Sequence, residues 1–249
     1  MKDETPTLSG ILGWIDRLLK CGDFDDLSNN GLQIAREGEA VSKVAVAVDA
    51  SLANVKRAGA AGAQLLVVHH GISWGGGIKR LTGGEYKIVR AALDANLALA
   101  AYHLPLDANK AVGNNWELAR LAGLSRIKSA FQYHGNVIGV TGRLAKPRRV
   151  AIGAREWTLP AGKIGICSGG AGEFAAAAKF LGCDLFLTGE ASWGDVIAAE
   201  NEGIPMVCAG HYETETFGVK ALAARLSAEL GVETVFIGRG EDEGAEVRQ

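Results

Sequence analysis

The chain has 249 residues, of which 48% are hydrophobic and 22% charged, so it can bury a substantial core without disulfides. Its 26 Lys and Arg against 28 Asp and Glu give a formal net charge of −2, which argues against a nucleic-acid or membrane-surface binder. The 34 glycines beside only 5 prolines favour an ordered fold with tight turns over disorder.

The cysteines and the first residues indicate the cellular compartment. The 4 cysteines stand singly and form no CxxC, which argues against a disulfide framework or a thiolate zinc site and suits a reducing cytosol. The acidic and polar start, MKDETPTL, does not resemble a signal peptide, and no apolar run approaches the roughly 18 residues that span a bilayer. We therefore expect a soluble cytoplasmic protein without a membrane partner.

Helix-like and strand-like segments alternate along most of the chain. An amphipathic helix is expected at 8–20, with Thr7 as its N-cap, and a polar loop with Asn29, Asn30 and Gly31 follows it. Short β-rich runs then occur at 44–48, 64–68, 97–102, 137–140, 163–167, 185–187, 205–209 and 232–237. Helical patterns lie between many of them, at 51–62, 84–95, 114–122, 172–182, 193–202 and 214–230. This alternation predicts an α/β fold with a largely parallel sheet.

The pattern divides the chain into two α/β halves. The expected parts are 1–124, a connecting segment at 125–160 with strands of its own, and a second half at 161–249. A weak internal echo supports this division, because one strand in each half leads to a Ser-Trp-Gly segment and the next leads to a histidine. We hypothesise that the halves are duplicated βα units that face each other across one site.

Four of the five histidines follow predicted strands. His69 and His70 follow one run, His103 follows the next, and His211 follows a run in the second half. Because ligands gather at the carboxyl ends of strands in open α/β sheets, these imidazoles are candidates for a common site. His134 lies in the connecting segment with no carboxylate at helical spacing, so we expect it to be structural.

Two carboxylates stand at ligand-like spacing from these histidines. Glu215 follows His211 by four residues, which places both on one face of any helix that includes them. Asp107 follows His103 by the same interval, although Pro105 argues against a regular helix there. Both carboxylates are therefore candidate ligands.

Such a set of imidazoles and carboxylates suits divalent transition metals. Without a thiolate, the ligand type does not separate zinc, iron, manganese and nickel. Five or six ligands are too many for one tetrahedral ion, and about the right number for a pair of ions. Two ions about 3.5–4 Å apart polarise a substrate oxygen and acidify water, which is typical of metal-assisted hydrolysis.

Six short motifs appear in a specific order between residues 30 and 215. They are Asn30-Gly31-Leu32-Gln33, Val68-His69-His70-Gly71, His103-Leu104-Pro105-Leu106-Asp107, Gly113-Asn114-Asn115, Thr188-Gly189-Glu190 and Ala209-Gly210-His211-Tyr212-Glu213-Thr214-Glu215. Each motif is weak alone, but the ordered set resembles the Nif-three-like family, whose members are often named GTP cyclohydrolase I type 2 homologs. The length is similar to that of the short bacterial members, which lack an inserted middle domain.

The resemblance implies two similar α/β halves packed around a dinuclear metal site. The family's ligands to the two divalent ions correspond here to His69, His70, Asp107, His211 and Glu215. The resemblance implies that Glu215 bridges the two ions. It also implies that His103 and Glu190 lie beside the ions, where they either orient the ligands or transfer protons. The resemblance also implies a ring-shaped homohexamer.

Two glycine-rich segments leave alternatives open. Ser168-Gly169-Gly170-Ala171-Gly172 follows a strand and precedes a helical pattern, so it either holds a phosphate through backbone amides or forms a tight βα turn. Gly75-Gly76-Gly77, with Lys79 and Arg80, forms either a flap over the metals or a solvated loop.

Three other residues follow predicted strands. Trp74 and Trp193 each follow a serine, and they either stack on a purine ring of the substrate or pack in the core. Asp49 ends the run at 44–48, and we expect no site role for it because nothing at ligand spacing accompanies it.

Two classes of function fit this sequence. The first is a dinuclear-metal hydrolase acting on a small nucleotide-like molecule, with Glu190 or His103 transferring a proton. The second is a metal-binding protein that inserts, stores or senses metal, or an oligomeric adaptor without turnover. Hydrolysis of a phosphoester or peptide on the same centre is a third option. The metal, the substrate and the size of the ring stay open.

Overall fold

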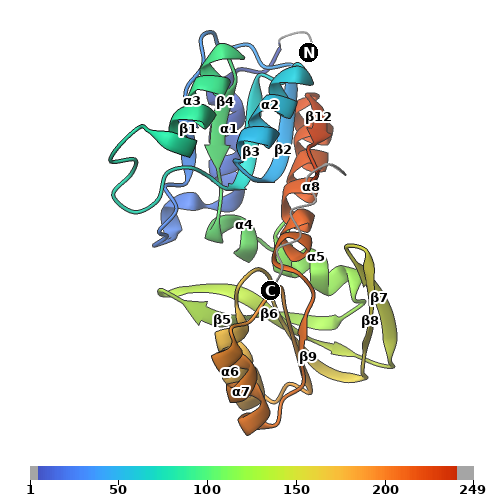
Figure 1. Ribbon diagram of the computed structural model, residues 1–249. Coiled ribbons are helices and arrows are strands. Elements are labelled where there is room, and N and C mark those ends of the chain that lie inside the picture. Colours follow the sequence, from blue (N-terminus) through green and yellow to red (C-terminus); the bar gives the residue numbers. More distant parts are fainter. Residues whose placement is uncertain (1–4, 240–249) are drawn as a thin grey trace.

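Two five-stranded sheets organise the chain, one above the other in Figure 1. The computed structural model describes residues 5–239. The upper sheet carries the N-terminal elements, and the lower sheet carries strands from the second half of the chain (Figure 1). Helices accompany both sheets, so the predicted α/β fold class is confirmed.

The first sheet has the strand order β1-β4-β3-β2-β12. Its strands are β1 (Gly31–Ile34), β4 (Ala98–Ala101), β3 (Leu65–His70), β2 (Lys43–Asp49) and β12 (Glu233–Phe236). The strands from β4 to β12 are parallel, and β1 runs antiparallel to β4. The apolar runs of β2 and β3 are unbroken because both faces of these strands are buried. The prediction of a loop at Gly31 was wrong, since β1 begins there as a short edge strand.

Helices cover both faces of the first sheet. On one face lie α1 (Leu8–Leu19) and α8 (His211–Leu230), and on the other α2 (Leu52–Ala60) and α3 (Gly83–Asp94). The amphipathic first helix and its cap are confirmed, because the Thr7 hydroxyl accepts a hydrogen bond from the Gly10 amide at 3.1 Å. The apolar face of α1 is buried against the sheet.

The second sheet has the order β11-β10-β9-β6-β5. Its strands are β11 (Met206–Cys208), β10 (Leu185–Thr188), β9 (Gly162–Cys167), β6 (Asn136–Leu144) and β5 (Ser125–Tyr133). The first three are parallel, while β6 and β5 are antiparallel to their neighbours. One face packs against α6 (Ala175–Phe180) and α7 (Trp193–Glu202). The other packs against α5 (Asn114–Leu121) and a hairpin of β7 (Arg148–Ile152) and β8 (Arg155–Leu159).

The two sheets do not follow the expected division at 1–124, 125–160 and 161–249. Strands β5 and β6 of the supposed connection belong to the second sheet. Strand β12, expected in the second half, pairs in parallel with β2 of the first sheet. Local sequence pattern predicts a strand but does not specify which sheet it joins. Residues 1–4 and 240–249 of the expected parts lie outside the described residues.

The parallel cores of the two sheets have the same strand order. Strands β2, β3 and β4 lie side by side in chain order in one sheet, and β9, β10 and β11 do so in the other. The edges differ, because the antiparallel neighbour is β1 beside β4 in the first sheet and β6 beside β9 in the second. The shared core order is what the hypothesis of duplicated βα units predicts.

Helix α8 connects the two sheets. Its first residues follow β11 of the second sheet, and its body packs on β2 and β12 of the first (Figure 1). A side chain at Gly218 would collide with Asn114, and the Gly218 amide donates to Asn114 Oδ1 at 2.6 Å, so α8 and α5 approach closely. In the described part of the chain, no helix combines the length and the hydropathy needed to cross a membrane.

Candidate metal centre

The predicted ligands meet between the two sheets, near the start of α8. His69 and His70 end β3, His211 begins α8, and Asp107 lies in α4 (Leu104–Ala108). Both α4 and the first turn of α8 lie between the sheets in Figure 1. The expectation that Pro105 argues against a helix there was wrong, because this proline occupies the first turn of α4, where its missing N–H has no intrahelical partner to lose.

Glu215 is the centre of this cluster. The helix α8 starts at His211, earlier than the pattern predicted, so His211 and Glu215 share one helical face as expected. Glu215 Oε1 lies 3.2 Å from His211 Nε2 and 3.5 Å from His69 Nε2, and Oε2 lies 3.5 Å from His70 Nε2. One carboxylate therefore faces imidazoles from both halves of the chain.

Asp107 also reaches His69. Its Oδ2 lies 3.5 Å from His69 Nε2. Its Oδ1 accepts hydrogen bonds from Asn114 Nδ2 at 2.8 Å and from the Ser168 hydroxyl at 3.1 Å. These two donors orient the carboxylate so that its second oxygen faces the histidine.

Every histidine of the cluster is held by its Nδ1 atom. Nδ1–H donates to a different oxygen in each case, 2.9–3.0 Å away, namely Tyr102 O for His69, Asp49 Oδ1 for His70, Asp26 Oδ1 for His103 and Glu190 Oε1 for His211. In a neutral imidazole this bond leaves the lone pair on Nε2. Metal-ligating histidines are typically oriented in this way by a carboxylate or a carbonyl.

The site offers two overlapping groups of donor atoms. His69, His70 and His103 form one group, and His70, His211 and Glu215 form the other, with the atoms of each group within 4.8 Å of one another. His103, implied to lie beside the metals, is thus close enough to His69 and His70 to be a ligand itself.

Two buried polar atoms of this cluster lack a hydrogen-bond partner within the described residues, which is the environment expected at a cation site. Among residues 5–239, His69 Nε2 and Glu215 Oε2 are buried and have no hydrogen-bond partner. Burying such polar atoms without a partner costs free energy, which a bound cation offsets. The imidazole and carboxylate donors match the preferences of divalent transition metals. The residues therefore fit a metal centre.

The charges in the metal-free cluster are strongly coupled. Burial acts to lower the pKa of His69, but Asp107 and Glu215 outweigh it and raise that pKa to about 10. The hydrogen bond to Glu215 raises the pKa of His211 to about 9 against the effect of burial. Burial acts to raise the pKa of Glu215, yet His69 and His211 hold it well below its usual range. In the absence of a cation, His69 and His211 therefore carry protons at neutral pH.

Comparison with known proteins identifies the family. The family model described as Duf34/NIF3 (NGG1p interacting factor 3) matches residues 6–242. This chain belongs to the Duf34/NIF3 family. It is 38% identical to the "GTP cyclohydrolase 1 type 2 homolog" of Deinococcus radiodurans, covering 91% of each chain, and 39% identical to that of Pyrococcus horikoshii, covering 91% of this chain and 96% of the relative.

Solved structures of the family have the same fold. The chain is 27% identical to a structure described as protein ybgI, unknown function, with a TM-score of 0.83 and coverage of 94% of this chain and 98% of the other. It is 31% identical to the protein TTHA1606 from Thermus thermophilus, with a TM-score of 0.77 and the same coverage. The resemblance inferred from the six motifs is confirmed.

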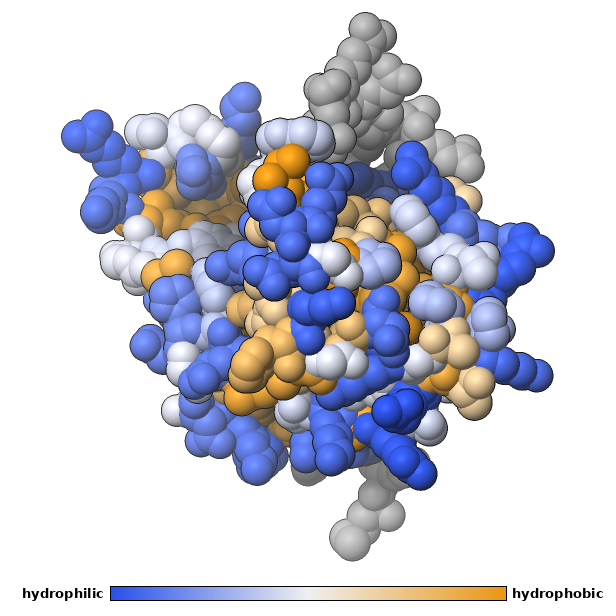
Figure 2. Space-filling view, turned by 90° about the horizontal axis from the view of Figure 1, so that it is seen from below, coloured by the Kyte–Doolittle hydropathy of each residue, from blue (hydrophilic) through white to orange (hydrophobic). Residues whose placement is uncertain are grey.

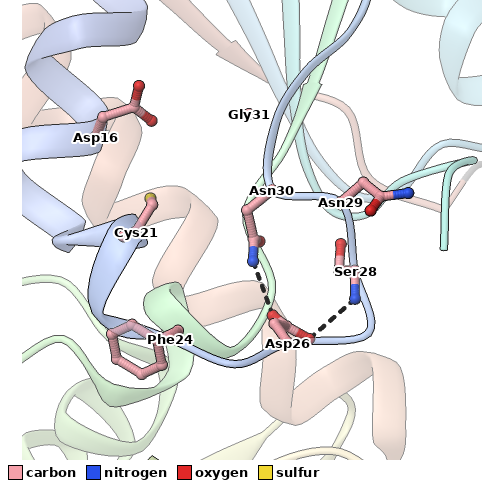
Figure 3. A pocket seen from close by; sticks show the side chains of 9 residues that line it. Asp16, Cys21, Phe24, Asp26, Ser28, Asn29, Asn30 and Gly31 are labelled. Carbon is pink, nitrogen blue, oxygen red and sulfur yellow. Dashed lines mark hydrogen bonds between the residues drawn. The ribbon is translucent and has the colours of Figure 1, made fainter. Parts of the chain in front are cut away.

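The Asn30-Gly31-Leu32-Gln33 motif of this Duf34/NIF3 chain holds residues that orient His103. Asn30 Oδ1 accepts from the His103 amide at 2.8 Å, and Asn30 Nδ2 donates to Asp26 Oδ2 at 2.9 Å. Asp26 in turn holds His103 Nδ1. Burial acts to raise the pKa of Asp26, but the hydrogen bond and charge of His103, together with the hydrogen bonds from Asn30 and Ser28, lower it to about 2. Asp26 is one of the residues that line a cavity of about 510 Å³. Figure 3 shows its hydrogen bonds with Asn30 and Ser28.

Two of these supporting carboxylates were missed by sequence reasoning. Asp49 was expected to have no site role, but it orients His70, because β2 and β3 are parallel neighbours with Asp49 opposite His70. A prediction of the strand order would have found it. Asp26 lies 77 residues before its partner His103, in a loop without a periodic pattern, so only its charge marks it.

The segment Ser168–Gly172 packs against Glu215 of the candidate metal centre, and its alternative role in holding a phosphate stays a prediction. A Cβ at Gly169, where φ is +67°, would collide with Glu215 Oε1. The segment leads into a 3₁₀ turn of three residues, Gly172–Phe174, and then into α6 of only six, which is shorter than the helix expected at 172–182. Glycine is required here because the backbone approaches the central carboxylate closely.

The other residues that the sequence analysis considered lie in different environments. Trp74 contacts the rings of His70 and His103, with centroids 6.1 and 5.1 Å apart. Trp193 is 76% exposed at the start of α7, which excludes its packing in the core of this chain. His134 lies in the turn between β5 and β6 against the ring of Tyr133. The glycine-rich segment with Lys79 and Arg80 projects beside the first sheet as an exposed loop (Figure 1).

Proposed function

We propose that this protein holds two divalent cations between its sheets and hydrolyses a small nucleotide-like substrate there. One observation carries the proposal. Within residues 5–239, His69 Nε2 and Glu215 Oε2 are buried without a hydrogen-bond partner, and they lie where donor atoms from both halves of the chain meet. Buried ionisable groups with strongly shifted pKa values, placed where strands end, are typical of functional sites.

Five side chains are assigned to the cations. They are His69, His70, Asp107, His211 and Glu215. Because the two oxygens of Glu215 face different histidines, this carboxylate is placed to serve both ions. Cations held there would polarise a substrate oxygen and acidify water.

His103 and Glu190 are the candidates for proton handling. Asp26 holds Nδ1 of His103, so Nε2 is the atom available to a substrate or to an ion. The Glu190 side chain is 61% exposed and accepts from His211 Nδ1 at 3.0 Å, so it orients a proposed ligand and is also open to solvent. His103 is the better placed of the two for proton transfer within the buried part.

The substrate class is carried over from the relatives. Proteins 34–39% identical to this chain are named GTP cyclohydrolase 1 type 2 homologs. A purine nucleotide is therefore the first substrate to test. We also place the protein in the cytosol, where its four cysteines, all in the described part and all free thiols, would stay reduced.

The test combines metal analysis with a hydrolysis assay. Protein loaded separately with Zn²⁺, Fe²⁺, Mn²⁺ and Ni²⁺ is incubated with GTP, and formate and ring-opened product are measured. Glu215→Gln should lose at least one bound ion and abolish turnover. The matched control Glu229→Gln, at the exposed far end of α8, should keep both.

The outcomes separate the proposal from a non-catalytic role. Bound metal without turnover of GTP, other nucleotides, phosphoesters or peptides would contradict hydrolysis and favour a metal-handling or adaptor protein. Unchanged metal content in Glu215→Gln would contradict the assignment of the centre itself.

A further inference from the structure

Trp74 lies beside two histidines of the candidate metal centre. The centroid of its ring is 5.1 Å from that of His103, with the planes at 76°, and 6.1 Å from that of His70. The residue is 38% exposed, although a buried cluster of ligands is directly beside it. A large aromatic side chain thus presents part of its surface to whatever enters the site.

The indole is held in place by its own segment. Trp74 Nε1 donates to Gly71 O at 3.0 Å, so the polar edge of the ring is already satisfied. Gly77 N donates to Trp74 O at 2.9 Å, which closes a turn directly after it. The part of the ring that stays open is therefore its apolar surface.

Residues 29–33, which include the Asn30-Gly31-Leu32-Gln33 motif, fix the backbone around this tryptophan. Gln33 Oε1 accepts from the amides of Ile72 and Ser73 at 2.7 and 3.1 Å, and the Asn29 amide donates to Ser73 O at 3.1 Å. Gly75 N donates to Leu27 O at 2.6 Å on the other side of Trp74. The loop that carries Asn29 and Asn30 in Figure 3 is thus the support of Trp74 as well as of His103.

A fixed, half-exposed indole suits one kind of ligand. A rigid aromatic side chain loses little conformational entropy on binding, and its π-face stacks on any planar heterocycle. We infer that Trp74 is the stacking surface for a planar aromatic heterocycle, such as a purine base, whose reacting atoms face the metal centre. This inference rests on the proposed function and names the part of the substrate that Trp74 recognises.

Binding experiments test the inference without relying on turnover. Zn²⁺-loaded protein is titrated by calorimetry with guanosine, adenosine, GTP and inorganic tripolyphosphate. Trp74→Ala should weaken the binding of guanosine by about tenfold or more and leave that of tripolyphosphate unchanged, whereas Trp74→Phe should retain most of the affinity. Trp193→Ala is the matched control, because this indole is exposed at the start of α7, and it should bind like the wild type.

A spectroscopic signature accompanies the affinity. Stacking of a base on an indole quenches its emission, so guanosine should quench the tryptophan fluorescence of the wild type and of Trp193→Phe but not that of Trp74→Phe. The metal content of each variant is measured in parallel, and it should not change. A loss of metal in Trp74→Ala, or equal weakening of every ligand, would show that Trp74 only seals the site and would overturn the inference.

Failure of the inference is distinguishable from failure of the proposed function. If the wild type binds neither nucleoside, or if Trp74→Ala binds guanosine as tightly as the wild type, Trp74 is not a stacking surface even where hydrolysis is observed. If guanosine binding depends on Trp74 but no substrate is hydrolysed, the stacking surface stands and the hydrolase proposal falls.

Discussion

The carboxylate of Asp49 lies 2.9 Å from Nδ1 of His70, although 21 residues separate the two in the chain. The parallel register of β2 and β3 places them directly opposite each other. The hydrogen bond orients the imidazole so that Nε2 faces Glu215, and the negative charge makes that nitrogen a better ligand. The ends of two neighbouring strands therefore build one half of the centre.

Asp49→Asn should weaken metal binding without unfolding the protein. Asparagine keeps an acceptor for His70 Nδ1–H but removes the charge, and loss of such partners typically costs 10–100-fold in metal affinity, so we expect about a tenfold loss for one ion. Competition with a chelator of known Zn²⁺ affinity measures it. Asp94→Asn, at the exposed end of α3, is the control. Equal affinities in the two variants would show that Asp49 has no part in the site.

The stability of the metal-free protein should fall as pH rises above neutrality. The pKa values of His69 and His211 are raised from 6.5 to about 10 and about 9, so the stability they contribute is fully present below pH 6.5 and is lost as pH rises through those values. The pKa of Glu215 is lowered from 4.5, so its contribution is present above pH 4.5 and is lost in acid. The contribution of this network is therefore largest between these limits.

Urea unfolding in a chelator, across pH 5 to 10, measures this dependence. Glu215→Gln removes the shared partner of both histidines and should flatten the fall between pH 6.5 and 9. A wild-type stability that rises over this interval would contradict the charges assigned to the cluster.

Metal binding should release protons at neutral pH. Because His69 and His211 are protonated in the metal-free protein, a cation must displace those protons, about two per chain. Calorimetric titration with Zn²⁺ in two buffers of different ionisation enthalpy gives the number released. The apparent affinity should also rise from pH 6 to pH 9. Binding without proton release would mean that the cation sits elsewhere.

Gly169→Ala should empty the site, whereas Gly182→Ala should not. Both glycines have positive φ, +67° and +72°, so alanine at either position costs about 1–2 kcal/mol of stability. Only at Gly169 does the new Cβ collide with the Glu215 carboxylate, while no described heavy atom lies within 4 Å of a Cβ at Gly182. Metal content and urea unfolding of the pair separate the two effects. Full metal content in Gly169→Ala would contradict the close packing of this loop on the centre.

Self-association into a ring-shaped homohexamer remains a proposal with a direct test. Phe180, at the end of α6, is 92% exposed, and Trp193, at the start of the adjacent α7, is 76% exposed. Figure 2 shows apolar patches between hydrophilic groups on the face seen from below. Large exposed apolar groups of this kind are typical of association surfaces. Light scattering should give six times the 26.0 kDa of one chain, and Phe180→Glu should lower that mass. A monomeric wild type would contradict the proposal.

Several features of the fold and site could be predicted from local sequence alone. The spacing of apolar residues predicted α1 and the alternation of strands with helices, because periods of 3.6 and 2 depend only on backbone geometry. The interval between His211 and Glu215 predicted that they share a helical face, which they do. The pattern also predicted histidines at or near the carboxyl ends of strands, because an apolar run that ends in polar residues marks the end of a strand.

Tertiary structure alone decided which distant segments meet. The return of β12 to the first sheet, the contact of Asp26 with His103 and the approach of Gly169 to Glu215 all join residues that no local period relates. These contacts depend on how two sheets and α8 pack together, and packing is a property of the whole chain. The sequence by itself determined the types of element and the candidate ligands, whereas the packing determined which carboxylate orients each imidazole.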